Sequence, residues 1–156
     1  MEISASISQK DIKMLKFNFG KITRRTADLR PIFQVSTKDL RRDLAEVFRT
    51  QGAVMGERWV GLTNSTKKAR IKAGFKPAPI LVRTGVLRRS LLGGAGNVNI
   101  MLPTTWKYGT DISYAIYHQS TAPRKKIPRR PFLYMSPKTR GNLVRRIHKY
   151  VITGKL

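Results

Sequence analysis

The 156-residue chain contains no cysteine. This absence excludes disulfide bonds, thiolate metal ligands and cysteine nucleophiles, and it suits a reducing compartment. Long hydrophobic runs are missing too, since no stretch approaches the ~18 consecutive apolar residues that a membrane-spanning helix needs. The segment Met1–Ser8 lacks the charged start and apolar run of a signal peptide. We therefore expect a protein that is made and used in soluble form.

Acidic residues are scarce. The chain has 8 Asp and Glu against 32 Lys and Arg, which gives a formal net charge of +24. The imbalance lies in the second part of the sequence, because residues 58–156 hold 21 basic residues and one acidic residue, Asp111. A charge this one-sided repels copies of the same protein and attracts polyanions or acidic protein surfaces.

Side chains suited to catalysis or to binding a metal or cofactor are also few. General acid–base chemistry would have to use His118, His148 or scattered carboxylates, and no serine-centred nucleophile motif accompanies them. We interpret His118 as a hydrogen-bonded structural histidine, with a catalytic role as the alternative. The glycine run at 93–96 follows a predicted helix and lacks Gly-Lys-Ser/Thr, which favours a turn over a phosphate-binding loop. We expect no enzymatic activity, no metal and no cofactor.

Hydrophobic periodicity predicts an α+β fold. The clearest helix spans residues 28–51, with Asp28 as its cap, Pro31 in its first turn and Gly52 after its end. Its charged face, where basic and acidic residues alternate, is predicted to face solvent. Shorter helices are predicted at residues 10–19, 65–72, 85–92 (capped by Thr84) and 112–119. A last helix begins at Ser136-Pro137.

Strands and loops complete this prediction. Alternating apolar residues predict a strand at 1–8, an antiparallel pair at 97–102 and 105–110, and a strand at 132–135. Residues 20–27 are predicted to be a connection and 120–130 an exposed, mobile basic loop. We expect one domain over residues 1–156, with a small antiparallel sheet packed by the long helix and the C-terminal helix, and with long basic loops.

The C-terminal helix is predicted to have an apolar and a basic face. The apolar stripe is expected to face the core and comprises Leu143, Val144, Ile147, Tyr150 and Val151. The outer face comprises Lys138, Arg140, Arg145, Arg146 and Lys149.

Several landmarks follow one another in a characteristic order. They are Trp59 and Leu62, Thr66-Lys67-Lys68, Leu81-Val82-x-Thr84-Gly85-x-Leu87-Arg88-x-Ser90-Leu91, Tyr114-Ala115-x-x-His118-Gln119, and Pro128-x-Arg130-Pro131-Phe132-Leu133. This series resembles the phage virion morphogenesis family, which includes tail-completion proteins, and is similar to the related neck (head–tail joining) family of tailed bacteriophages. The resemblance covers about residues 28–152. One departure is Ser120-Thr121, where family members often have a glycine after the His-Gln pair.

The resemblance implies a structural protein of the virion, assembled in the bacterial cytoplasm. It would form a ring, a hexamer or dodecamer, around the DNA channel at the head–tail junction. Its neighbours would be neck, connector, tail-terminator or sheath proteins. Several landmark residues read as specifying the fold: Trp59, Thr84, Gly85, Leu87, Tyr114, His118, Pro131 and Phe132.

The basic residues outside the predicted core are candidates for contacts with partners. They are Arg124, Lys125, Lys126, Arg129, Arg130, Arg140, Arg145, Arg146 and Lys149. They would bind DNA phosphates or acidic faces of neighbouring proteins. We favour docking on proteins, because a strongly cationic channel would bind DNA through counterion release and would slow its ejection. The alternative function is a free basic nucleic-acid-binding protein, although no helix-turn-helix, zinc finger or aromatic stacking platform is recognisable.

Overall fold

Helices dominate the computed structural model, which describes residues 8–122 and 127–156 and has the α+β fold that the sequence predicts. The helical elements are α1 (Gln9–Ala27), α2 (Arg30–Thr50), the 3-10 turn η1 (Ala53–Met55), α3 (Asn64–Lys72), α4 (Val86–Leu91), the 3-10 turn η2 (Ser113–Ala115), α5 (Ile116–Gln119) and α6 (Pro137–Thr153). The strands β1 (Asn97–Met101) and β2 (Trp106–Thr110) pair antiparallel, as predicted. The strand predicted at residues 1–8 lies outside the described residues, Ser8 excepted.

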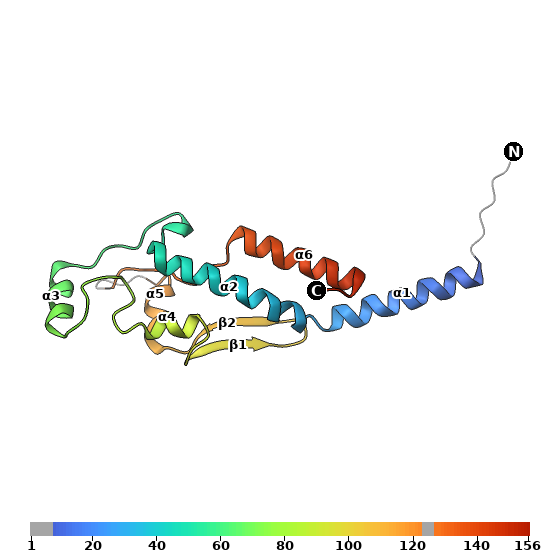
Figure 1. Ribbon diagram of the computed structural model, residues 1–156, viewed down its shortest axis with the longest axis horizontal. Coiled ribbons are helices and arrows are strands. Elements are labelled where there is room, and N and C mark those ends of the chain that lie inside the picture. Colours follow the sequence, from blue (N-terminus) through green and yellow to red (C-terminus); the bar gives the residue numbers. More distant parts are fainter. Residues whose placement is uncertain (1–7, 123–126) are drawn as a thin grey trace.

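The elements are arranged around α2, which runs along the middle of the molecule (Figure 1). The helix α6 lies on one side of α2 and the β-hairpin on the other. Beyond one end of this body extends α1, whereas α3 lies at the opposite end. The result is an elongated molecule with a different element at each end.

The helix α2 forms because apolar residues recur at helical spacing, and Phe33, Leu40, Leu44 and Val47 are buried. Its N-cap is Leu29 and not Asp28, which corrects the predicted cap. The Asp28 carboxylate instead accepts hydrogen bonds from the backbone and side chain of Arg30, which lower the pKa of Asp28 to about 2. At the other end the chain turns at two left-handed residues, 51 and 52.

The core lies where α2, α4 and the segment after α5 meet. Its buried residues are Leu40, Leu44, Val47, Phe48, Trp59, Leu87, Leu91, Ala115 and Phe132. The indole of Trp59 packs edge-on against Phe48 with ring centroids 5.5 Å apart, and its Nε1 donates to the Pro131 carbonyl at 2.7 Å. Trp59, Leu87 and Phe132, which the sequence marks as specifying the fold, therefore lie in the core.

The segment at residues 132–135 is not a strand, although Phe132 enters the core as predicted. The side-chain oxygen of Gln119 accepts hydrogen bonds from the backbone nitrogens of Phe132 and Leu133, at 3.0 and 3.2 Å. An amide side chain thus satisfies donors that a neighbouring strand would otherwise bind. Leu133, the next residue of this segment, is exposed.

The entry to α4 differs from the prediction as well. The N-cap of α4 is Gly85, with a φ of 75°, and no side chain caps the helix. Thr84 precedes this left-handed residue and contributes its carbonyl, which accepts a hydrogen bond from Arg89 Nη1 at 3.1 Å. The predicted role of Thr84 as an N-cap is therefore wrong, whereas Gly85 occupies a conformation that glycine adopts without strain.

The first helix is longer than predicted, because α1 continues through residues 20–27. A capping box between Ser8 and Asp11 starts the helix, and Ile22 extends the apolar stripe of Ile12, Leu15 and Phe19. Basic residues in the last turn favour the negative end of the helix dipole. The Lys and Arg content of residues 20–27, which suggests a loop, is thus compatible with a helix.

Candidate assembly surfaces

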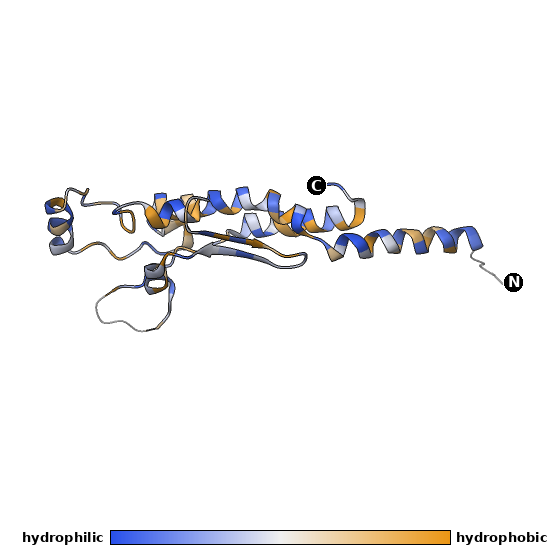
Figure 2. Ribbon diagram, turned by 90° about the horizontal axis from the view of Figure 1, so that it is seen from below, coloured by the Kyte–Doolittle hydropathy of each residue, from blue (hydrophilic) through white to orange (hydrophobic). Residues whose placement is uncertain are grey.

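The helix α1 presents an apolar face that the other described residues of the chain leave uncovered. No residue of Gln9–Ala27, all of which the structure describes, is buried. Leu15 is 48% exposed and Phe19 64% exposed. Apolar residues recur along the projecting helix between hydrophilic ones (Figure 2). A helix of this length with so little burial is marginal in water, because packing supplies most helical stability.

The C-terminal end of α1 is fixed to the body by one side chain. Arg25 Nη1 donates to the carbonyl oxygens of Val151 and Ile152 at 3.0 and 2.7 Å. These carbonyls belong to the last turn of α6, where a cation is favourable. The Leu15 and Phe19 side chains lie further along α1, towards its N-terminus, so the tether holds the helix without covering its apolar face.

A second apolar surface lies on the body of the molecule. A groove of about 280 Å³ runs between α2, β2 and the segment after Phe132. The residues that line it carry no charge and are Leu40, Leu44, Trp106, Tyr108, Leu133, Tyr134 and Met135. This groove and the α1 face are different parts of the same chain, and both are apolar.

The basic residues proposed as contact sites separate into three groups. Arg129, Arg140, Arg145 and Lys149 are exposed. Arg124, Lys125 and Lys126 lie outside the described residues. Arg130 and Arg146 are engaged within the fold, which the charge pattern of the sequence does not reveal.

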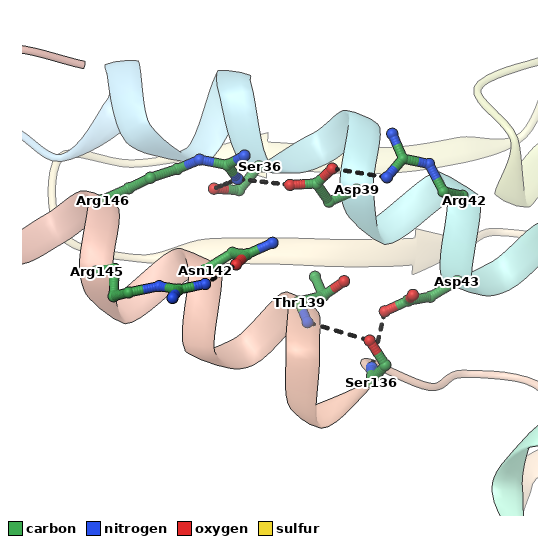
Figure 3. Close-up of polar contacts among 9 residues, drawn as sticks. All are labelled: Ser36, Asp39, Arg42, Asp43, Ser136, Thr139, Asn142, Arg145 and Arg146. Carbon is green, nitrogen blue, oxygen red and sulfur yellow. Dashed lines mark hydrogen bonds and ion pairs between the residues drawn. The ribbon is translucent and has the colours of Figure 1, made fainter.

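Arg146 joins α6 to α2, and its predicted place on the outer face is therefore wrong. Its Nη1 lies 2.7 Å from Asp39 Oδ2 and 3.3 Å from Ser36 Oγ, to which it donates (Figure 3). Close by, Asp43 accepts a hydrogen bond from the Ser136 backbone nitrogen at 2.7 Å. The charged face of α2 thus holds α6 in place, which corrects its interpretation as a solvated face. Because acidic residues are scarce in this chain, Asp39 and Asp43 could have been identified from the sequence as partners of groups elsewhere in the fold.

The predicted beginning of α6 at Ser136 and Pro137 is confirmed. Ser136 caps the helix by accepting from the Thr139 backbone nitrogen, and Pro137 is the first residue. Leu143, Ile147 and Val151 are partly buried, but Val144 is 54% exposed and does not belong to the core stripe.

Arg130 is 7% exposed, so the expectation of a wholly exposed loop at 120–130 fails at this residue. Its Nε donates to the Val60 carbonyl at 2.9 Å and its Nη2 to the Gly61 carbonyl at 3.2 Å. Its backbone nitrogen donates to the His118 carbonyl at 3.0 Å. The side chain therefore connects the segment after α5 with the loop that follows Trp59.

His118 and Tyr114 lie beside Arg130, on the wall of a cleft. Burial lowers the pKa of His118, and the nearby charge of Arg130 lowers it further, against the effect of a hydrogen bond with the Pro128 backbone. The buried Nδ1 of His118 has no hydrogen-bond partner among the described residues. Tyr114 is exposed at the cleft.

The described part of the chain contains no cluster of metal-binding side chains and no helix that could span a membrane. Within residues 8–122 and 127–156, no three His, Asp or Glu side chains come together in a way that could hold a metal ion. None of the helices there is long and apolar enough to cross a membrane.

Comparison with known families gives one result that covers nearly the whole chain. The model of the phage virion morphogenesis family matches residues 10–151. The match confirms the resemblance and extends it over α1. Comparison with curated proteins and with solved structures gives no match. The chain belongs to the phage virion morphogenesis family, which gives it a role in the structure or assembly of the virion among other virion proteins.

Proposed function

We propose that the protein is a ring-forming component of the neck or tail-completion complex at the head–tail junction, with the DNA channel at the centre of the ring. The observation that carries this proposal is the uncovered apolar face of α1, together with the apolar groove beside Trp106 on the same chain. A contact between two unlike surfaces is heterologous, and it forms a closed ring when the rotation between copies closes. A hexamer or dodecamer is the expected ring.

In this ring the α1 face of one copy packs into the groove of the next. Leu15 and Phe19 would be removed from water, and each side chain that is fully buried would stabilise the contact by roughly 2 kcal/mol. The groove lining carries no charge, so it does not add to the repulsion between these basic chains. Arg129, Arg140, Arg145 and Lys149 then remain available for acidic faces of connector, terminator or sheath proteins.

The test compares two double variants of α1. Leu15→Ser with Phe19→Ser alters the proposed contact face. Met14→Ser with Phe17→Ser is the matched control, since these side chains are 53% and 62% exposed and lie on another side of the helix. Both variants should fold, because neither removes a buried residue. In sedimentation velocity at high salt, we expect only the first variant to lose assembly.

The same variants can be tested in infection of a host by phage that lack the gene. Supplying the wild-type protein or the control should restore joined particles, whereas Leu15→Ser with Phe19→Ser should leave separate heads and tails. Normal infectious particles in the complete absence of the protein would refute the proposed function. Equal assembly of both variants would exclude α1 as the contact.

A further inference from the structure

A cleft of about 440 Å³ is lined in part by α3, the helix that lies at the end of the molecule opposite α1 (Figure 1). Its walls come from α3, from the segment at 81–84 and from α5. Leu81 and Ile127 supply apolar surface, and Arg70, Arg83 and His118 supply polar groups. A neighbouring pocket shares these five residues and adds Arg130, so the two form one continuous hollow, which we call the arginine cleft.

Three arginines meet in the arginine cleft, and none of them has an acidic partner among the described residues. Arg70 Nη1 donates to the Pro79 carbonyl at 2.9 Å, and Arg130 donates to two backbone carbonyls. The Arg83 guanidinium lies 5.4 Å from the centre of the Phe75 ring. None of the ion pairs found among residues 8–122 and 127–156 involves any of the three.

The charges of these arginines affect one another. Burial lowers the pKa of Arg70, and the charge of Arg83 adds to this effect. Burial and the charge of Arg70 lower the pKa of Arg130 in the same way. Neutral carbonyls do not offset this repulsion as a carboxylate would. The arginines of the cleft therefore repel one another, and a bound anion would reduce this repulsion.

The second observation is the imidazole of His118, which lies on the shared wall of the cleft. Its buried Nδ1 is without a hydrogen-bond partner in the described part of the chain. Buried polar atoms are nearly always paired in native proteins, so an unpaired one calls for an explanation. This unpaired atom shows that the polar contacts of the His118 wall are incomplete within the described residues.

We propose that the arginine cleft binds an acidic segment of a neighbouring virion protein, with a carboxylate on Arg70 and Arg83 and an apolar side chain against Leu81 and Ile127. The proposal rests on the proposed function, which places such neighbours beside this chain. Arginine binds carboxylates through two parallel hydrogen bonds, and mixed apolar and polar walls are typical of sites that recognise side chains.

Duplex DNA fits the cleft less well. Phosphates are usually contacted by side chains that project from a protein surface, whereas Arg130 is buried and Arg70 is partly buried. The apolar wall formed by Leu81 and Ile127 offers nothing to a phosphate backbone. The exposed Lys67, Lys68 and Lys72 of α3 surround the region with positive charge that would attract an acidic segment.

The experiment measures binding of a fluorescent peptide that alternates Asp-Glu pairs with Leu. A second peptide with Asn and Gln in their place is the uncharged reference. At 0.15 M salt we expect the acidic peptide to bind at least about tenfold more tightly. Arg83→Ala should weaken its binding about tenfold, a loss of about 1.4 kcal/mol. Lys68→Ala removes the same charge from an exposed site outside the cleft lining, and should weaken binding less than about twofold.

Two outcomes would overturn the proposal. Equal losses in Arg83→Ala and Lys68→Ala would show that bulk charge, and not the cleft, attracts the peptide. A 20-base-pair DNA duplex that loses as much affinity as the peptide in Arg83→Ala, and competes with the peptide, would assign the cleft to phosphate. The ring is tested separately, because Leu15→Ser with Phe19→Ser should still bind the peptide and Arg83→Ala should still assemble.

Discussion

Gly52 shows at the residue scale how closely the chain packs after α2. Its φ is 88°, and a Cβ placed on it would lie 2.6 Å from Cδ1 of Trp59. The Trp59 ring is also held by Phe48 and by the hydrogen bond to Pro131, so a shift of the ring would disturb both contacts. Only glycine fits this position without displacing a core indole.

We expect Gly52→Ala to lower the free energy of unfolding by roughly 3 kcal/mol, the sum of a strained left-handed alanine and a displaced Trp59. The measurement is chemical denaturation followed by tryptophan fluorescence, in which Trp59 should also change its emission.

Gly56→Ala is the matched control for this prediction. Gly56 has a φ of 101°, but no atom lies within 4 Å of the added Cβ. This variant should therefore show only the cost of the backbone conformation, about 1–2 kcal/mol. If the two variants lose equal stability, the contact with Trp59 contributes nothing beyond backbone strain.

At the scale of elements, the joint between α2 and α6 contains a partly buried ion pair between Asp39 and Arg146 (Figure 3). The Asp39 side chain is 13% exposed, and the Arg146 side chain 29%. Removing one partner leaves the other charge partly buried, and this cost exceeds the net contribution of the pair itself.

Asp39→Asn should therefore lower the free energy of unfolding by about 2 kcal/mol. Arg145→Ala is the control, because this neighbouring arginine is exposed and bonds only Asn142 among the described contacts, so its loss should cost less than about 0.5 kcal/mol. Thermal unfolding of both variants and of Arg146→Ala measures these differences. A stability of Asp39→Asn within 0.5 kcal/mol of the wild type would contradict the role of the joint.

The elements themselves were largely predictable, because helical and alternating periodicity are local signals. This accounts for α2, the hairpin, α3 and the cap of α6 at Ser136. Such local signals do not reveal contacts between residues that are far apart in the sequence. Arg130 bonds a carbonyl 70 residues away, so no local pattern distinguishes it from a surface charge.

The same difference between local patterns and long-range contacts applies to the candidate sites. Arg70, Arg83 and Arg130 are far apart in the sequence and meet only after folding, so the arginine cleft could not be predicted from spacing. The charge of residues 58–156 favours polyanions or acidic protein surfaces as partners, but it does not indicate where they would bind. For α1, the basic residues of 20–27 concealed the second part of a helix whose apolar face the other described residues leave uncovered.

At the scale of the whole molecule, the net charge of +24 opposes the contact that would form the ring. Two copies repel each other over the Debye length, which is roughly 10 Å at 0.1 M salt and 3 Å at 1 M. The proposed contact between the α1 face and the groove is apolar, so salt leaves its attraction in place while screening the repulsion. Self-association should therefore strengthen as salt increases, which is the opposite of binding to a polyanion.

We expect the purified protein to be monomeric at 0.05 M salt and to associate at 1 M, with affinity rising by about tenfold or more, or about 1.4 kcal/mol. Sedimentation velocity over a salt series measures this directly. Leu15→Ser with Phe19→Ser should stay monomeric at every salt concentration, because screening alone supplies no attraction. Association that weakens with salt would mean that opposite charges hold the copies together, and it would exclude the apolar contact. A neighbour's acidic segment bound in the arginine cleft would lower the same repulsion, so the acidic peptide should promote association of the wild type at 0.05 M.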